Sequence, residues 1–235
     1  NGSSLKLYLD GALVGEDNSI GTIGYNGAQF LRLGRWGGGG RHLKGKIDEL
    51  DIYTRALTAG EVAAVYAAGA TGKCVPAQCV TTPTNQVATF KGQNNANDSQ
   101  GTNNGTASGG VTYSTGKVGQ AFDLADGNAN VTIPDSPSLR PDSFTVEGWF
   151  NFTTYSNEFR MLFNKPTADP SYSSYGVYIY GGLLTAQSSD GVNLGNTLQH
   201  SLNPTPGQWY HIAFTRQAGG QQKLFVNGIE VDSDA

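Results

Sequence analysis

Two cysteines, Cys74 and Cys79, are the residues of this sequence whose type and spacing point most directly to chemistry. They are the only cysteines of the 235 residues, and they lie in a proline-containing segment outside any apolar run. A pair so close in sequence favours a local disulfide, which persists in oxidising, extracellular surroundings. Two free thiols are the alternative. A zinc site is not supported, because two ligands without a nearby histidine or second cysteine pair fall short of four.

Aromatic side chains form a second set of candidates, since an aromatic ring offers a flat apolar face for a ligand. In two segments with period-two alternation, one row of side chains is apolar and is predicted to face the core, and the other row to face outward. The outward row supplies our candidate glycan-binding residues, which are Tyr178, Tyr180, Trp209 and His211. The alternative is that each of them packs against the protein or covers a sheet edge.

No arrangement of residues indicates a nucleophile paired with a base. The three histidines, His42, His200 and His211, lie far apart in the sequence, and no G-x-S-x-G motif is present. A basic stretch from Arg32 to Lys46 surrounds four consecutive glycines and is a candidate for contact with acidic glycans, with a solvated hairpin loop as the alternative. It lacks the glycine spacing and the following helix of a phosphate-binding loop.

Composition narrows the function classes further. The 33 glycines and 9 prolines, with only 14% charged residues, argue against long amphipathic helices and coiled coils. The net charge of −4 gives no basic character for binding nucleic acid. No run approaches the roughly 18 consecutive apolar residues of a membrane span. The sequence lacks an initiator methionine and a leader, so we expect a fragment or a processed product without its export signal.

The elements that must position these residues are predicted to be β-strands. Apolar residues recur at every second position in segments separated by clusters of Gly, Asn and Asp, as in Phe144, Val146 and Phe150. This pattern predicts an antiparallel β-sandwich. One helix is expected after Thr58, which has capping-box spacing to Glu61. Its predicted buried face consists of Val62, Val65 and Tyr66. Gly69 is the glycine expected just after its C-terminal end.

The two ends of the sequence carry copies of one segment. Residues 2–14 (GSSLKLYLDGALV) match residues 219–231 (GGQQKLFVNGIEV) without a gap, at an offset of 217. Each copy has Asp-Gly or Asn-Gly between two short apolar runs, which is the dipeptide chemistry of a type I′ hairpin. The sequence therefore spans one repeat period plus a second copy of this hairpin.

Four motifs in the chain resemble one known family. They are GKIDELDIYTRALTAGEV (45–62), GKVGQAFDL (116–124), VTIPDSPSL followed by FTVEGWF (131–150), and GQWYHIAFTR with KLFVNG (207–228). With these motifs the chain resembles the laminin G-like domains of the concanavalin A-like lectin/glucanase superfamily, especially those in tandem in bacterial surface proteins. The resemblance implies an antiparallel jelly-roll sandwich with one short helix.

The order of the motifs suggests how the chain is divided. In the family the IDE segment and its helix close the domain, whereas here they come first. Residues 1–72 thus resemble the C-terminal part of one domain, 73–84 a linker holding the expected disulfide, and 85–235 the N-terminal part of the next domain. Neither part can bury its sheets alone. In one alternative they complete each other within one chain, and the two terminal hairpins then compete for the same position in the sheet. In the other, the N-terminal part of one domain pairs with the C-terminal part from another chain, head to tail. An arbitrary slice of a longer array would also carry the hairpin twice.

The resemblance also implies a cation site and raises the question of catalysis. Many members hold calcium near the start of the IDE strand and in a nearby DG loop, which correspond here to Asp48, Asp126 and Asn128. The related glucanases place carboxylates on alternate positions of a strand, as Glu49, Asp51 and Tyr53 stand here. They need a further Glu where this sequence has Tyr53, so the acid pair of a retaining hydrolase is incomplete.

We therefore expect a non-enzymatic, secreted or cell-surface module of a tandem array, with a role in adhesion, spacing or fibre formation. Its expected partners are neighbouring copies of the same repeat and cell-surface or matrix glycans, and structural calcium is its expected cofactor. The alternative is a carbohydrate-binding module. Neither nucleic-acid binding nor a membrane span is expected.

Overall fold

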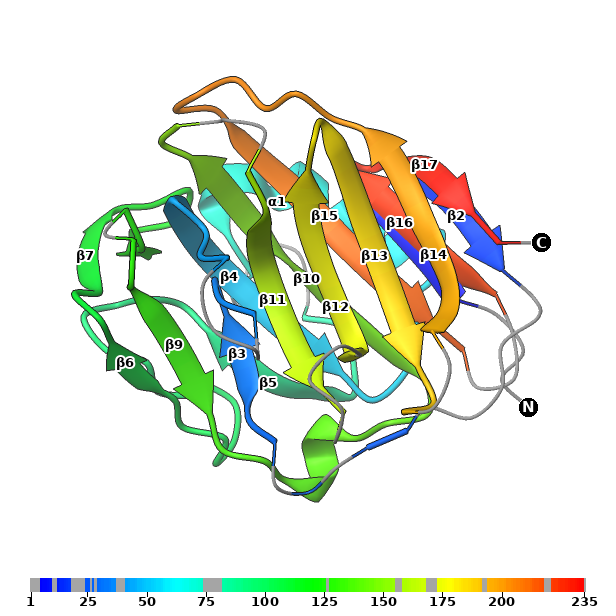
Figure 1. Cartoon of the computed structure of the whole chain (residues 1–235), viewed down its shortest axis with the longest axis horizontal. Coiled ribbons are helices and arrows are strands. Elements are labelled where there is room, and N and C mark those ends of the chain that lie inside the picture. The colour runs from blue at the N-terminus through cyan, green and yellow to red at the C-terminus, as the bar shows by residue number, and fades with distance from the viewer. Residues whose placement is uncertain are drawn as a thin grey trace.

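Alternating apolar residues place most of this chain in two β-sheets that pack face to face (Figure 1). The computed structural model describes residues 5–9, 12–17, 24–25, 27, 29–36, 41–73, 82–125, 127–154, 158–167, 173–191, 194–217 and 221–234. All strand pairs within these residues are antiparallel, with one exception discussed below. The predicted all-β antiparallel sandwich with one short helix is confirmed.

Ten strands form the larger sheet. Eight of them follow the order β17-β16-β1-β15-β10-β4-β8-β7, with β2 beside β1 and β5 beside β4. Their bounds are β1 Leu5–Leu9, β2 Ala12–Asp17, β4 Gly45–Tyr53, β5 Gln86–Phe90, β7 Thr112–Thr115, β8 Gln120–Asp123, β10 Phe144–Phe152, β15 Trp209–Arg216, β16 Gln222–Val226 and β17 Ile229–Ser233.

Seven strands form the second sheet, in the order β14-β13-β12-β11-β3-β9-β6. Their bounds are β3 Leu31–Leu33, β6 Thr106–Ser108, β9 Asn130–Ile133, β11 Arg160–Pro166, β12 Ser173–Tyr180, β13 Leu183–Ser189 and β14 Leu194–Ser201. The core lies between the two sheets, where the predicted inward rows, among them Val146, Val177 and Ile212, are fully buried.

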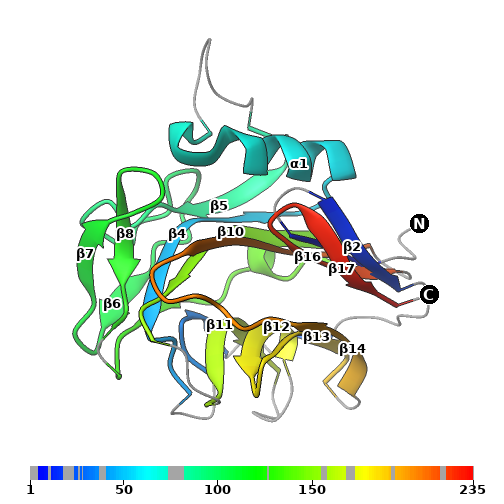
Figure 2. The ribbon, with the colours of Figure 1, turned by 90° about the horizontal axis from the view of Figure 1, so that it is seen from above.

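The predicted helix is α1, Ala59–Ala68, which lies on the outer side of the ten-stranded sheet (Figure 2). Thr58 caps it through the expected reciprocal hydrogen bonds with Glu61, and Val62 and Val65 are buried. Tyr66 is 38% exposed, so it lies at the edge of the buried face. Gly69 ends the helix with a φ of 48° and begins the short 3₁₀ helix η1, Gly69–Thr71. No helix in the described ranges is long and apolar enough to cross a membrane.

Strands from the two ends of the sequence alternate within both sheets. In the ten-stranded sheet β4 pairs with β10 along one edge and with β5 and β8 along the other. In the seven-stranded sheet β3 pairs with β11 and β9. In this structure the N-terminal segment and the rest of the chain therefore complete one sandwich together. The assignment of residues 1–72 and 85–235 to two successive domains of an array stays a prediction.

Both terminal hairpins lie at the same end of the ten-stranded sheet, where β2 and β17 are neighbours (Figures 1 and 2). The second hairpin turns at Asn227 and Gly228 with φ values of 51° and 81°. Two successive positive φ values are those of a type I′ turn, as its Asn-Gly dipeptide predicts. The corresponding Asp10 and Gly11 of the first hairpin, most of the 73–84 linker, and both Cys74 and Cys79 lie outside the described residues.

Candidate functional site

Four ionisable side chains form a buried charge cluster on the outer face of the ten-stranded sheet. They are Asp51 on β4, Glu147 on β10, His211 on β15, and Lys73, which follows η1. β10 lies between β4 and β15, and Asp51 is the direct cross-strand partner of Glu147. Side chains alternate along a strand, so the three strand residues project away from the core. Helix α1 lies on this outer side of the sheet (Figure 2).

Lys73 joins the two carboxylates of this cluster. Its Nζ donates to Glu147 Oε1 at 2.9 Å and forms an ion pair with Asp51. The same Nζ lies 3.4 Å from the backbone carbonyl oxygen of Glu49. Only 6% of the Lys73 side chain is exposed, so this cation fastens the segment that follows α1 to two adjacent strands.

Glu147 Oε2 and Asp51 Oδ2 have further partners, whereas Asp51 Oδ1 has no hydrogen-bond partner among the described residues. His211 Nε2 lies 2.7 Å from Glu147 Oε2, and the Tyr53 hydroxyl donates to Asp51 Oδ2 at 3.0 Å. Above them, the ring of Tyr66 from α1 lies tilted over the ring of His211. The cluster is therefore a closed polar layer between the sheet and the helix.

Burial and charge act against each other on these groups. Burial would raise the pKa of Glu147, but the Lys73 ammonium and the bond to His211 outweigh it and lower this pKa to about 2. Burial raises the pKa of Asp51 well above its ordinary value, and the Glu147 carboxylate adds to that effect, although Lys73 opposes it. Burial would lower the pKa of Lys73, yet the two carboxylates raise it. The same cation thus lowers the pKa of Glu147 and opposes the rise in the pKa of Asp51.

A β-bulge changes the face that strand alternation assigned to Glu49. The β4–β10 register shifts so that Trp149 is paired with Asp48 while Glu147 is paired with Asp51. Glu49 takes the extra position and has a positive φ of 49°. Asp51 and Tyr53 share one face as expected, but both are fully buried and bonded to each other. Neither is open to a sugar substrate.

Of the three predicted calcium ligands, the structure describes two, and these two differ in burial. Asp48 is fully buried, its Oδ2 accepts from the Val118 amide at 2.7 Å, and its Oδ1 has no partner among the described residues. Burial raises the pKa of Asp48 to about 7. Asn128 is exposed in the turn between β8 and β9, and Asp126 lies outside the described residues. Within the described ranges no group of three or more His, Cys, Asp or Glu side chains is placed to hold a metal.

The four predicted glycan contacts do not lie together. Tyr178 and Tyr180 are on β12 in the seven-stranded sheet, whereas Trp209 and His211 are on β15 in the ten-stranded sheet. His211 is fully buried in the charge cluster. Alternation assigned each residue to the outer side of its strand but gave no information on which sheet that strand joins.

Tyr178 and Tyr180 belong to a group that we call the outer aromatic patch. Its members are Trp36, Arg41, Phe159, Tyr178 and Tyr180. The rings of Phe159 and Tyr178 are stacked with centroids 4.4 Å apart. The Arg41 guanidinium lies 4.4 Å from the Trp36 centroid and 4.6 Å from that of Phe159, which are cation–π distances. Tyr180 is 57% exposed, so the patch offers one open ring beside a fixed cation.

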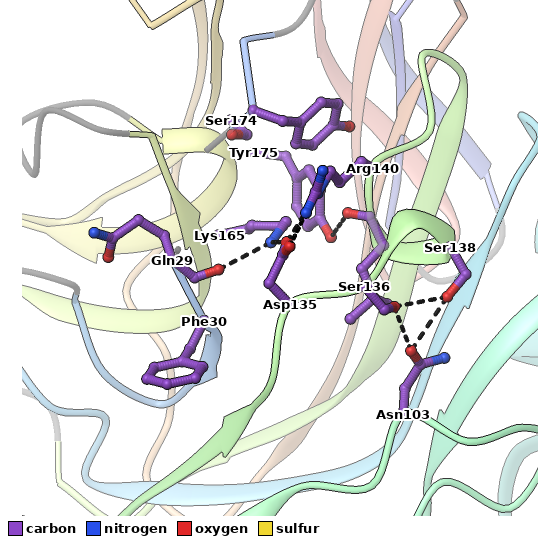
Figure 3. A network of polar contacts seen from close by, with 12 residues as sticks. Gln29, Phe30, Asn103, Asp135, Ser136, Ser138, Arg140, Lys165, Ser174 and Tyr175 are labelled. Carbon is purple, nitrogen blue, oxygen red and sulfur yellow. Dashed lines mark hydrogen bonds and ion pairs between the residues drawn. The ribbon is translucent and has the colours of Figure 1, made fainter. Parts of the chain in front are cut away.

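A second polar network fixes the IPDSPSL motif against the seven-stranded sheet (Figure 3). Asp135 forms ion pairs with Arg140 and with the fully buried Lys165 of β11. Lys165 Nζ also donates to the Gln29 carbonyl at 3.1 Å, which ties the N-terminal segment to this network. Burial would raise the pKa of Asp135, but the hydrogen bonds from Arg140 and Lys165 lower it.

The serines of the same motif bind a neighbouring loop (Figure 3). Asn103 Oδ1 accepts from Ser136 at 2.6 Å and from Ser138 at 3.2 Å. The carbonyl of Leu139, at the end of the short 3₁₀ helix η2 (Pro137–Leu139), accepts from the buried Tyr175 hydroxyl at 3.0 Å. These contacts give the polar residues of the motif a structural role.

Sequence reasoning missed Lys73, Glu147 and Phe159 as members of these sites. Glu147 carried a signal, since it is the charged residue on the outward row of an otherwise apolar strand. Lys73 and Phe159 carried none, because each reaches its partners from a loop whose path is set by tertiary packing.

Comparison with known proteins gives one match. A family model described as the concanavalin A-like lectin/glucanases superfamily, laminin G-like, matches residues 1–63 and 125–235. No curated protein and no solved structure matches the chain. The two matched segments are those whose strands alternate within both sheets.

The charge cluster predicts a large effect of removing its cation. Lys73→Met keeps the length of the side chain but leaves buried carboxylates without their positive partner, which costs about 3–5 kcal/mol of unfolding free energy. Urea denaturation followed by tryptophan fluorescence measures this loss.

Two further variants show whether the loss of stability in Lys73→Met comes from the charge cluster. Adding Glu147→Gln to Lys73→Met removes the unpaired charge and restores part of the stability. Lys91→Met, at a half-buried lysine after β5, serves as the matched control and changes stability by less than about 0.5 kcal/mol. Equal losses in Lys73→Met and Lys91→Met would show that the cluster contributes nothing.

Proposed function

This chain belongs to the laminin G-like family of the concanavalin A-like lectin/glucanase superfamily, and from that premise we propose that it is a non-catalytic structural and adhesive module of a tandem array. Laminin G-like domains are generally non-enzymatic and typically extracellular. We place the module in a secreted or cell-surface protein, where neighbouring repeats lie head to tail and complete one another through their strands to form fibres.

The buried charge cluster is the observation that supports the non-catalytic part of the proposal. Asp51 and Glu147 are opposite each other on adjacent strands, where carboxylates of a hydrolase would need access to a sugar. Here both are at most 1% exposed and are bonded to Lys73 beneath α1. An acid and a nucleophile in this state have no route to substrate.

The repeated hairpin supports the tandem, head-to-tail part. Similar hairpin sequences stand at residues 2–14 and 219–231, and their strands β1, β2, β16 and β17 lie at one end of the ten-stranded sheet. The repeat period is about the size of one sandwich, as expected for an array in which each unit carries one hairpin.

Electron microscopy and small-angle X-ray scattering test the assembly. The protein concentration is varied from about 1 μM to about 1 mM, because linked modules reach effective concentrations in the millimolar range. Over this range the particles should become longer while their cross-section stays constant. Unchanged particle dimensions over that range would contradict fibre formation. Release of reducing sugar from β-glucans that is lost in Glu49→Gln would contradict the non-catalytic role.

We propose structural calcium as a cofactor of this module. Asp48 supports it, because its Oδ1 is a buried oxygen without a partner among the described residues, and oxygen atoms of this kind bind Ca²⁺. Calcium would supply a fixed positive charge there and hold the surrounding loops together.

Melting temperatures with calcium chloride and with EDTA test this cofactor. Calcium in large excess over its Kd should raise the melting temperature by several degrees, since a ligand that binds only the folded state stabilises it by about 3–4 kcal/mol. Asp48→Asn should abolish the response, and Asp142→Asn, at an exposed carboxylate, should keep it. Identical melting curves with calcium and EDTA would remove calcium from the proposal.

Carbohydrate binding is the second candidate function, and the outer aromatic patch favours it. Tyr180 is open to solvent beside the Phe159–Tyr178 stack and the Arg41 guanidinium, so the patch can present a ring face and a cation to a sugar.

A glycan array tests this candidate with a pair of aromatic variants. Specific binding should fall about 2- to 10-fold in Tyr180→Ala, because one aromatic contact contributes about 0.5–1.5 kcal/mol. Trp209→Ala, on the other sheet, should keep binding. Equal loss in both variants, or no specific binding at all, would count against this site.

A further inference from the structure

Strand β15 has more pairing partners than a strand has edges. Its residues Phe214, Thr215 and Arg216 pair with β10, with β1 and with β16. Phe214, for example, is opposite Val146, Leu7 and Leu224. A strand offers one row of hydrogen-bonding groups on each of two edges, and β10 takes one of them. The other edge, which we call the β15 slot, is therefore shared by β1 and β16.

The two strands share the β15 slot in equivalent registers. β1 and β16 are paired in parallel, Tyr8 with Phe225 and Leu9 with Val226. Phe225 comes 217 residues after Tyr8, which is the offset of the sequence repeat. Tyr8 and Leu9 of the first copy thus lie beside their own repeat equivalents.

The aromatic side chains show that one copy excludes the other. The ring centroids of Tyr8 and Phe225 are 2.7 Å apart with planes inclined by 5°. Neighbouring aromatic rings need centroid separations of about 4.5–7 Å. These two rings therefore mark one position with two alternative occupants, as do the fully buried Leu7 and Leu224.

The second hairpin has the advantage within its own chain. Only residues 217–221 separate β15 from β16, so little loop-closure entropy is lost when they pair. The Asn227 amide donates to the His211 carbonyl at 2.8 Å, and the Asn227 Oδ1 accepts from the His211 amide at 3.0 Å. β1 comes from the distant end of the chain and has three residue pairs with β15, against five for β16.

We propose that the β15 slot is a docking site for a single β-hairpin and that its partner is the displaced hairpin of a second copy of this chain. The hairpin β16–β17 fills the slot of its own chain, and β1–β2 is then available to a slot elsewhere. The proposal deepens the head-to-tail arrangement proposed above by naming the residues that would join neighbouring copies.

Both hairpins make the same kind of contact with the β15 slot, so local concentration contributes to which of them fills it. Either hairpin adds a strand to the same edge and inserts a leucine into the core. An occupant in the same chain competes at an effective concentration of about 1 mM. Docking between copies is thus favoured where neighbours are held close, or where a slot has lost its own hairpin.

A double-mutant cycle on the equivalent leucines tests mutual exclusion. Leu7→Asp and Leu224→Asp each disable one hairpin, and the other then fills the slot. We expect each single variant to melt within about 2 °C of the wild type and the double variant to melt about 10 °C lower or more. Additive losses would show that both hairpins are simultaneous members of the sheet and would overturn the proposal.

Complementation between chains tests the partner. The double variant Leu7→Asp/Leu224→Asp has a slot without a usable hairpin, whereas the wild type has one hairpin to spare. Mixing or co-expressing the two should give a species of two chain masses in analytical ultracentrifugation and restore the melting temperature of the double variant. If the double variant fails to fold alone, co-expression with the wild type should recover it in soluble form.

The single variants are the matched controls for this mixture. Each has one usable hairpin, which its own slot takes, so neither should complement the double variant. Complementation by Leu7→Asp, or none by the wild type, would overturn docking between copies. The proposed fibre formation can fail while this inference stands. In that case the double-mutant cycle would be non-additive and the wild type would complement the double variant, but no elongated particles would form.

Discussion

The central position of β4 is the constraint on which the rest of the molecule depends. This strand comes from the N-terminal segment, yet it pairs with β10 on one edge and with β5 and β8 on the other. Without it the ten-stranded sheet would be divided, and two inner edges would expose their backbone groups. β3 has the same role between β11 and β9 in the second sheet. A sandwich of this family therefore forms only where both sequence segments are present, whichever chain supplies them.

The contacts of α1 follow from that arrangement. β4 leads directly into Thr58 and the helix, and the chain then returns over the sheet to place Lys73 between Asp51 and Glu147. A buried pair of this kind adds little net stability compared with apolar packing, but removing one partner alone is strongly destabilising. The cluster thus ties the segment after α1 to the sheet and closes the sheet face that carries Asp51 and Glu147.

Much of the fold follows from local sequence, whereas the sites do not. Period-two alternation identified strands such as β10, the Thr58–Glu61 pair identified the helix start, and Asn227–Gly228 identified a turn, because each depends on neighbours in the chain. The bulge at Glu49 was not predictable, since it arises from the β4–β10 register. For the same reason Tyr178 and Trp209 were grouped although their strands belong to different sheets. The burial of His211 depends on a helix that is remote in sequence.

The β15 slot has a consequence for the ends of any such array. A hairpin outside a slot presents a strand edge and an apolar row to water, which is the type of surface from which β proteins aggregate or are cut by proteases. Inside an array the neighbouring unit covers that surface. The last unit has no neighbour, so an array built on this principle requires a terminal cap, as solenoid proteins do. The same duplication that links the units would then also determine where growth must stop.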